Sequence, residues 1–310
     1  MILTLDPFDT GRFAILPSRG VPDFGQRLAF ASIARQLDVN TAIIGNSTIQ
    51  LVDPARLSEL SARKAVSLAV PGTGPLEQLA IADWFLRHHR NTPQLAMVIG
   101  IDSTWCTTED PIPITNPFPF WLYSPSRLEY ARNMMNYKSI EAALRKVKML
   151  ANLDRKARPD GYHDYDPGHP WHKPDFSSPI SQGDFVLAQG ESATDTDIGG
   201  SAASFTAAPL LRGFLRTLDG GVRVVLVVLP RHKSGLPPPG SAAGEKLDRC
   251  KAAYRALVQS RFGARFLDFL VDSEMVRTDE NFWDKVHFRG PVARLVEDQL
   301  ATALSATDSR

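Results

Sequence analysis

Cysteine is scarce in this chain of 310 residues, which contains only Cys106 and Cys250. Two cysteines this far apart form neither the close spacing of a zinc site nor a framework of several bridges. We expect buried thiols at both positions, with a disulfide between them as the alternative. Cys106 has no evident basic partner in the sequence, so a cysteine nucleophile is not predicted.

The chain also has no large excess of positive or negative charge. The chain has 35 Lys and Arg against 34 Asp and Glu, and its formal net charge is +1. The basic residues are scattered and are not interleaved with aromatic residues, as they would be in a nucleic-acid groove. The charge therefore gives no reason to expect nucleic acid or an anionic membrane as a partner.

Long apolar segments are absent as well. No stretch approaches the roughly 20 apolar residues that a membrane span needs. The first residues, MILTLDPFDTGRF, have neither a basic n-region nor a long apolar segment and are not typical of a signal peptide. As written, the chain is expected to be soluble and cytoplasmic. An anchor preceding Met1 would instead place it in the periplasm or cell envelope.

What the sequence does contain is a regular alternation of short apolar runs and helical patterns. The runs, each short enough for a buried strand, are residues 42–44, 65–70, 95–101, 222–229 and 265–270. The helical patterns are residues 54–63, 75–89, 207–218, 245–262 and 290–304. Continuous apolar strands separated by helices predict an α/β fold, a three-layer α/β/α sandwich with a mostly parallel five-stranded sheet.

The alternation is interrupted after the third run, between residues 103 and 206. This stretch is rich in Pro, Gly, Asp and aromatic residues, and its helical patterns are confined to residues 126–136 and 139–153. Loops of this length within a compact domain are usually functional. We expect a single domain over residues 1–310, with an N-terminal extension at 1–40 and an insertion at 103–206 that acts as a lid over the strand ends.

Polar residues follow the apolar runs at the sheet edge where open parallel sheets bind ligands. Gly45-Asn46-Ser47-Thr48 follows the first run and Pro71-Gly72-Thr73-Gly74 follows the second. Asp102 and Ser103 follow the third, and Asp284-Lys285-Val286-His287 precedes the last helical pattern. A serine, an acid and a histidine thus fall on one edge of the predicted sheet, which is the strongest functional signal in the sequence.

Residues in these segments suit nucleophilic catalysis. Ser47 on a tight turn can project its hydroxyl into a cleft, but a hydroxyl needs a base at neutral pH. Histidine can accept and return a proton near neutrality, so His287 suits that role, and Asp284 can fix its tautomer. The backbone N–H groups of the helix after Ser47 and of the Gly72 turn can stabilise an oxyanion.

The segments around Ser47, Gly72 and Asp284-x-x-His287 resemble the SGNH (GDSL-like) hydrolase superfamily over almost the whole chain, apart from the insertion. They are most similar to its bacterial envelope branch, which is linked with polysaccharide O-acetylation and deacetylation. The resemblance implies a flavodoxin-like sandwich, a Ser47–His287–Asp284 triad, and Ser47 and Gly72 as oxyanion donors. It also implies a serine esterase or O-acetyltransferase that acts on a small acyl ester of a carbohydrate, without a metal or cofactor.

Two residues depart from the family pattern. Asn46 stands where the first block usually has aspartate, and Asp102 stands where the third block usually supplies an asparagine that donates to the oxyanion. Asn46, Thr73, Asp102 and Ser103 are expected to line the site. The departure at Asp102 keeps an alternative open: a non-catalytic glycan- or protein-binding protein of the same fold, with a degenerate oxyanion hole.

Simpler structural roles compete with catalysis. Ser47 can be a helix N-cap, and Asp284 can cap the last helix beside an exposed His287.

The segment GYHDYDPGHPWHKPD also holds metal-ligand types, namely His163, Asp164, Asp166, His169 and His172. Their spacing matches no zinc pattern, so no metal is predicted. The aromatic residues of the segment, Tyr162, Tyr165 and Trp171, can either stack on a sugar ring or hold the insertion in place.

Overall fold

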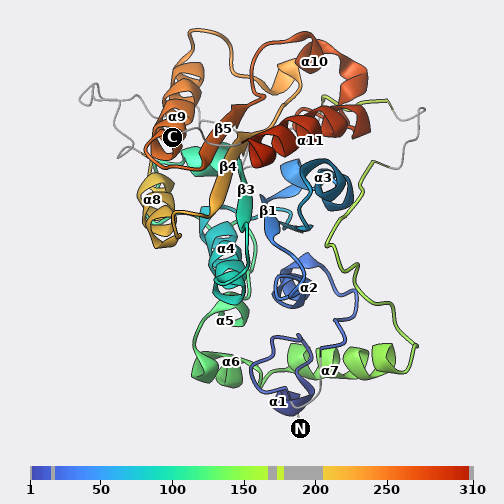
Figure 1. Ribbon diagram of the computed structural model, residues 1–310. Helices are drawn as coiled ribbons and strands as arrows, with labels where there is room; N and C mark the ends of the chain where they lie inside the picture. The colour runs from blue at the N-terminus through green and yellow to red at the C-terminus, as the bar shows by residue number, and fades with distance from the viewer. Residues whose placement is uncertain (1, 15–17, 167–172, 178–204, 307–310) are drawn as a thin grey trace.

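The computed structural model describes residues 2–14, 18–166, 173–177 and 205–306 (Figure 1). Within them, five strands form one sheet in the order β2-β1-β3-β4-β5, and every neighbouring pair is parallel. The strands are β1 (Thr41–Gly45), β2 (Ala65–Ala69), β3 (Ala96–Ile101), β4 (Arg223–Val228) and β5 (Ala264–Asp268). This is the doubly wound order of flavodoxin-like sheets.

Helices cover both faces of the sheet. Figure 1 shows α3 (Pro54–Ser61) and α11 (Gly290–Ser305) on one side of the strands. On the other side lie α4 (Pro75–His89), α8 (Ala207–Thr217) and α9 (Ala242–Gln259). Successive residues of β1 face opposite cores: Ile43 packs with the α3 and α11 side and Ile44 with the other. The prediction of a three-layer α/β/α sandwich is confirmed.

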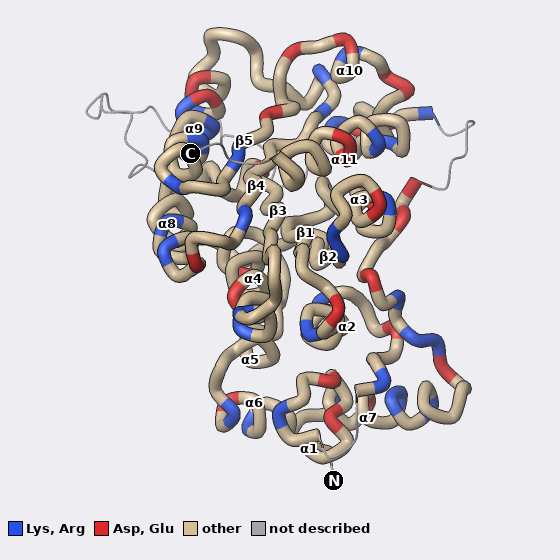
Figure 2. Tube along the Cα trace, viewed as in Figure 1, with Lys and Arg blue, Asp and Glu red and all other residues tan. Residues whose placement is uncertain are grey.

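Both faces of the central strands are buried, which explains their largely apolar sequence, whereas β5 at the edge is only partly buried. All residues of β1, β2 and β3 are buried. Figure 2 shows few charged residues along the central strands, whereas Lys, Arg, Asp and Glu are spread over the helices and loops. Most charged residues therefore lie outside the two hydrophobic cores, although Glu77 and Glu297 are fully buried.

Of the remaining helices, α2 (Gln26–Ile33) packs against β2 and the others are short or lie away from the sheet. The others are α1 (Ile2–Leu5), α5 (Phe120–Tyr123), α6 (Arg127–Asn133), α7 (Tyr137–Leu150) and α10 (Glu274–Arg277). Helix α7 begins earlier than its pattern predicts because the Asn136 side chain accepts a hydrogen bond from the Ser139 N–H at 2.9 Å. Figure 1 shows α1, α6 and α7 together at the end of the molecule where the N-terminus lies.

The first residues of the chain are anchored by buried polar contacts. The Asp6 carboxyl group accepts a hydrogen bond from the Tyr130 hydroxyl at 2.8 Å. Asp9 lies 3.7 Å from the buried ammonium of Lys146, on the inner side of α7. These contacts attach α6 and α7 to the N-terminal segment. The lid function expected for residues 103–206 stays a prediction.

The expectation of two separate thiols is wrong. Cys106 and Cys250 form a disulfide with a Cα–Cα distance of 5.5 Å across a sequence separation of 144 residues. Cys106 ends the short 3₁₀ helix η2 (Ser103–Cys106), which follows β3 and packs against α9. The sequence alone gave no measure of this proximity, because it depends on how α9 packs beside the end of β3.

Candidate active site

The turn after β1 presents the Ser47 hydroxyl. β1 ends at Gly45, and Asn46 caps the 3₁₀ helix η1 (Ser47–Ile49) by accepting a hydrogen bond from the Thr48 N–H at 3.1 Å. Capping is thus performed by Asn46 and not by Ser47. The Ser47 Oγ instead lies 2.9 Å from His287 Nε2.

His287 in turn contacts Asp284. The distance from His287 Nδ1 to Asp284 Oδ2 is 2.8 Å. The other oxygen, Asp284 Oδ1, accepts the backbone N–H groups of Val286 and His287, each at 2.8 Å. Asp284 therefore closes a local turn of its own. The N-cap position of α11 is occupied by Arg289, so Asp284 does not cap that helix.

The charge of Asp284 is stabilised in this turn. Its burial alone would raise the pKa of its carboxyl group, but the hydrogen bond from His287 and the two backbone N–H groups leave that pKa lowered. The side chains of His287 and Asp284 remain 28% and 36% exposed. A carboxylate thus faces the imidazole Nδ1, and solvent can still reach the site.

The loop that carries Asp284 and His287 is held at both sides. Its ends pair through a β-bridge between the buried Phe282 and Phe288, and the Trp283 N–H donates to the His287 carbonyl at 2.8 Å. The backbone N–H of His232, which follows β4, donates to the Lys285 carbonyl at 3.1 Å. These bonds fix the position of the imidazole ring relative to the strand ends.

Residues of the insertion also reach this loop. The Tyr165 ring meets the His287 ring edge-on, with centroids 5.6 Å apart, and its hydroxyl donates to the Phe288 carbonyl at 3.1 Å. Asp166 Oδ2 accepts the Gly290 N–H at 2.6 Å, at the start of α11. The sequence pattern marked this segment as aromatic and acidic, but did not predict its contact with His287.

The turn after β2 places Gly72 at the same edge of the sheet. Gly72 has a φ of +63°, which favours glycine, and a Cβ at this position would lie 2.6 Å from Asn116 Nδ2. Asn116 donates to the Gly72 carbonyl at 3.2 Å, and Arg27 donates to the Pro71 carbonyl at 2.7 Å. Sequence reasoning missed both Arg27 and Asn116, which lie far from Gly72 in the chain.

The other predicted lining residues are mostly engaged in structural contacts. The Thr73 hydroxyl is buried and donates to the Val70 carbonyl at 2.7 Å. Ser103 Oγ accepts a hydrogen bond from Arg231 at 3.4 Å. Thr73 therefore stabilises the β2 turn, and Ser103 links the end of β3 to the end of β4.

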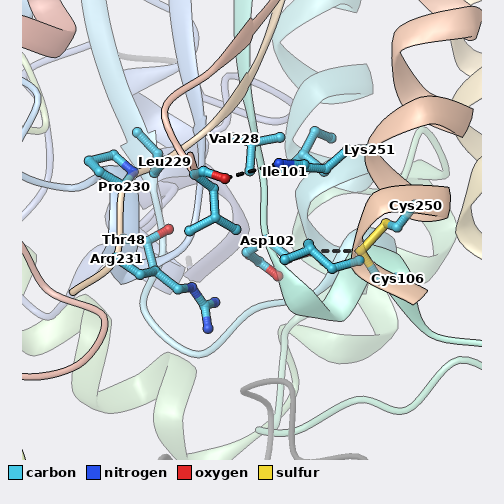
Figure 3. A pocket seen from close by; sticks show the side chains of 12 residues that line it. Thr48, Ile101, Asp102, Cys106, Val228, Leu229, Pro230, Arg231, Cys250 and Lys251 are labelled. Atoms are coloured by element: carbon cyan, nitrogen blue, oxygen red, sulfur yellow. Dashed lines mark hydrogen bonds between the residues drawn. A yellow bond between two sulfur atoms is a disulfide. The ribbon is translucent and has the colours of Figure 1, made fainter. Parts of the chain in front are cut away.

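Asp102 and Asn46 contact each other directly. The Asn46 Nδ2 donates to Asp102 Oδ2, while Asp102 Oδ1 accepts the Thr104 N–H at 2.7 Å and the Thr104 hydroxyl at 2.6 Å. Figure 3 shows the Asp102 carboxyl group and the Arg231 guanidinium lining one small pocket near the Cys106–Cys250 disulfide. Both carboxyl oxygens of Asp102 thus accept hydrogen bonds from the protein.

Within residues 2–14, 18–166, 173–177 and 205–306, no three His, Cys, Asp or Glu side chains are grouped as they would be around a metal ion. Two ligand types of the GYHDYDPGHPWHKPD segment, His169 and His172, lie outside these ranges, as does Trp171.

Among the described helices, none has the length and apolar character to cross a membrane.

Comparisons with known proteins find a distant structural likeness. No family model and no curated protein matches the chain. A solved structure from Streptococcus pneumonia, whose name refers to a platelet activating factor, aligns with a TM-score of 0.39 and 12% sequence identity. The alignment covers 90% of this chain and 89% of the other. A likeness this distant assigns no activity.

Proposed function

We propose that the protein is a serine esterase or O-acyltransferase of the SGNH type, acting on a small acyl ester of a carbohydrate. The observation that supports this most directly is the contact series from Asp284 to His287 to Ser47, with distances of 2.8 and 2.9 Å. An acid, an imidazole and a hydroxyl in this order form the arrangement that activates a serine nucleophile.

In the proposed mechanism, Ser47 Oγ attacks the acyl carbon and its proton passes to His287 Nε2. Asp284 accepts the Nδ1–H bond, so it holds the tautomer whose Nε2 can act as a base and stabilises the imidazolium that forms. The tetrahedral intermediate then expels the alcohol, which takes the proton back from His287. Water resolves the acyl-enzyme in an esterase, and a sugar hydroxyl does so in a transferase.

The backbone N–H groups of Ser47 and Gly72 are the proposed oxyanion donors. Within the described part of the chain, neither donates to a protein acceptor. Asn116 and Arg27 hold the carbonyl groups of the Gly72 turn, and this contact fixes the direction of the turn. Preorganised donors of this kind stabilise an oxyanion without reorganisation during the reaction.

The pair Asn46 and Asp102 bears on the alternative function. Relative to the family pattern, the amide and the carboxyl group have exchanged positions, and they remain in contact. A carboxyl group at position 102 cannot replace the asparagine that usually donates to the oxyanion. This feature favours the second candidate, a non-catalytic glycan- or protein-binding protein of the same fold.

Labelling with a fluorophosphonate probe separates the two candidates. The proposed enzyme is labelled stoichiometrically at Ser47, and labelling is lost in Ser47→Ala and His287→Ala. Ser234→Ala is a matched control, because Ser234 also bonds a histidine, His232, at 2.7 Å, and His232 contacts Asp279 at 3.0 Å. A folded wild-type protein that takes no label at Ser47, or takes it at Ser234, contradicts the proposal.

Hydrolysis and transfer share one active site and need a second measurement. The purified protein is incubated with an acetyl donor, with and without an oligosaccharide acceptor. Acetate release without acceptor identifies an esterase, whereas acetyl-oligosaccharide formed with little free acetate identifies a transferase.

The disulfide between Cys106 and Cys250 favours an oxidising compartment, hence the periplasm or envelope rather than the cytoplasm.

A further inference from the structure

Helix α7 turns its large apolar residues outward. Tyr137, Ile140, Leu144 and Val147 follow one another at helical spacing and are between 50% and 78% exposed. The residues that face the protein are smaller or polar, namely Ser139, Ala142, Ala143, Lys146 and Met149. A surface helix usually buries its apolar side, so this orientation is the reverse of the ordinary one.

Neighbouring segments extend this apolar surface. Leu128 on α6 is 62% exposed, Met135 between the two helices is 87% exposed, and Leu153 after α7 is 76% exposed. Together with Tyr137, Ile140, Leu144 and Val147, these three residues form what we call the α7 apolar face. Large exposed apolar side chains gathered in one part of a fold are typical of an interaction site.

Basic residues outnumber acidic residues in the segment that carries the face. Residues 127–153 contain six Lys and Arg against two Asp and Glu, although the whole chain has a formal net charge of only +1. Two of the six are paired internally, Arg145 with Asp154 and Lys146 with Asp9. The exposed Arg132, Lys138 and Lys148 have no ion-pair partner among the described residues. Figure 2 shows the basic positions on α6 and α7 at the end of the molecule near the N-terminus.

We propose that the α7 apolar face binds the surface of an anionic lipid bilayer, with α7 lying in the plane of the interface. An amphipathic helix with exposed apolar residues and a basic margin is the usual element for such binding. Anionic headgroups attract each nearby Lys or Arg, and the apolar side chains enter the boundary of the acyl chains. A second copy of this chain is a poorer occupant, because a symmetric contact would bring the two basic margins together.

This inference does not depend on the proposed catalytic function. It also explains why the charge of the whole chain gave no indication of a membrane partner. The positive charge of residues 127–153 is offset by a net negative charge in the rest of the chain, so the total is close to zero. The short range of electrostatic attraction in salt makes the local charge, and not the total, decisive at a surface.

Vesicle flotation of the full chain tests the proposal. The wild type is expected to bind vesicles of phosphatidylglycerol and phosphatidylcholine, to bind pure phosphatidylcholine at least about tenfold more weakly, and to lose binding as salt rises. Ile140→Glu and the double variant Lys138→Glu/Lys148→Glu should each weaken binding to the anionic vesicles at least about tenfold.

Matched controls place the same substitutions on other helices. Leu295 on α11 is 54% exposed, so Leu295→Glu introduces the same charge at an equally exposed apolar site. Arg212→Glu/Arg216→Glu on α8 reverses two exposed cations elsewhere. Both controls should keep wild-type binding, and circular dichroism should show that all variants are folded.

Several results would overturn the proposal. The first is a wild type that does not bind anionic vesicles at low salt. The second is equal binding by the α7 variants, or an equal loss of binding in the α8 control. The third is a dimer in sedimentation velocity that Ile140→Glu converts to a monomer, because that result assigns the face to a second copy of the chain.

Discussion

The side-chain amide of Asn46 donates a hydrogen bond to the carboxyl group of Asp102, and this contact joins the end of β1 to the end of β3. Each residue also caps the 3₁₀ turn that follows its own strand, Asn46 through Thr48 and Asp102 through Thr104. The two caps are therefore in direct contact, and a substitution at one of them is expected to affect the other.

A double-mutant cycle at these positions should measure that coupling. Asn46→Asp alone places two carboxyl groups in contact and should destabilise the fold by about 1–3 kcal/mol. Adding Asp102→Asn restores an amide–carboxyl pair and should recover most of that loss in urea unfolding. The double variant also places an amide at position 102, so labelling of Ser47 should be faster than in the wild type. Additive stability effects of the two substitutions would contradict the coupling.

Gly72→Ala should weaken both stability and activity. The left-handed backbone at φ +63° costs an alanine about 1–2 kcal/mol, and the new Cβ would lie 2.6 Å from Asn116 Nδ2. The displaced turn should slow fluorophosphonate labelling by up to about 10²-fold. Asn116→Ala in the same chain should relieve the close contact but not the backbone cost, so it should restore only part of the stability. Wild-type stability and labelling in Gly72→Ala would show that this turn does not require glycine.

Asp284→Asn should leave the fold intact and slow the labelling of Ser47 by roughly 10³–10⁴-fold. An amide can still accept the backbone N–H groups of Val286 and His287, but it no longer stabilises the imidazolium or selects the tautomer. Asp279→Asn is the control, because Asp279 also contacts a histidine ring but lies outside the proposed triad. Equal rates in the two variants would argue against a role for Asp284 in catalysis.

Protonation of His88 on unfolding should make the protein less stable in mild acid. Burial lowers the pKa of His88 to about 4, from an ordinary value of 6.5, with its ring against Trp84. The unfolded chain therefore binds a proton before the folded chain does, and stability should decline as the pH falls from about 6.5 to about 4. Urea unfolding at intervals from pH 8 to pH 4 should show a shallower decline in His88→Gln. Identical curves for the two proteins would show that His88 is not the group responsible.

Loss of the disulfide should lower the free energy of unfolding by about 2–5 kcal/mol, because the bond closes a loop of 144 residues. The measurement is urea unfolding of Cys250→Ser beside the wild type. A reducing agent should destabilise the wild type by a similar amount and leave Cys250→Ser unchanged. A wild type that is insensitive to reduction would show that the bond adds little.

Much of the fold follows from the sequence because the strands are buried on both faces. Residues 222–229 and 65–70 are apolar except for Arg223 and Ser67, and such runs form strands where helices cover both sides. The proximity of Ser47 to His287 could be anticipated for a similar reason, since the carboxyl ends of parallel strands meet at one edge. The turn at Asp284 is local and needs only residues 284–287.

Other parts of the site depend on packing that no local pattern encodes. Arg27 and Asn116 reach the Gly72 turn from segments far apart in the chain, and Tyr165 reaches His287 from the insertion. Helix α7 gives a third example. Its periodicity predicts a helix with one apolar side, but only the tertiary structure shows that this side faces outward.

The Cys106–Cys250 bond also determines whether the fragments made by a protease separate from each other. Residues 107–249, which include most of the insertion together with α8 and β4, lie between the two linked positions. A protease that cuts the backbone once within this range therefore produces two fragments that remain covalently joined. Such a nicked molecule should migrate as one band on a non-reducing gel and as two bands after reduction, with Ser47 and His287 on different fragments.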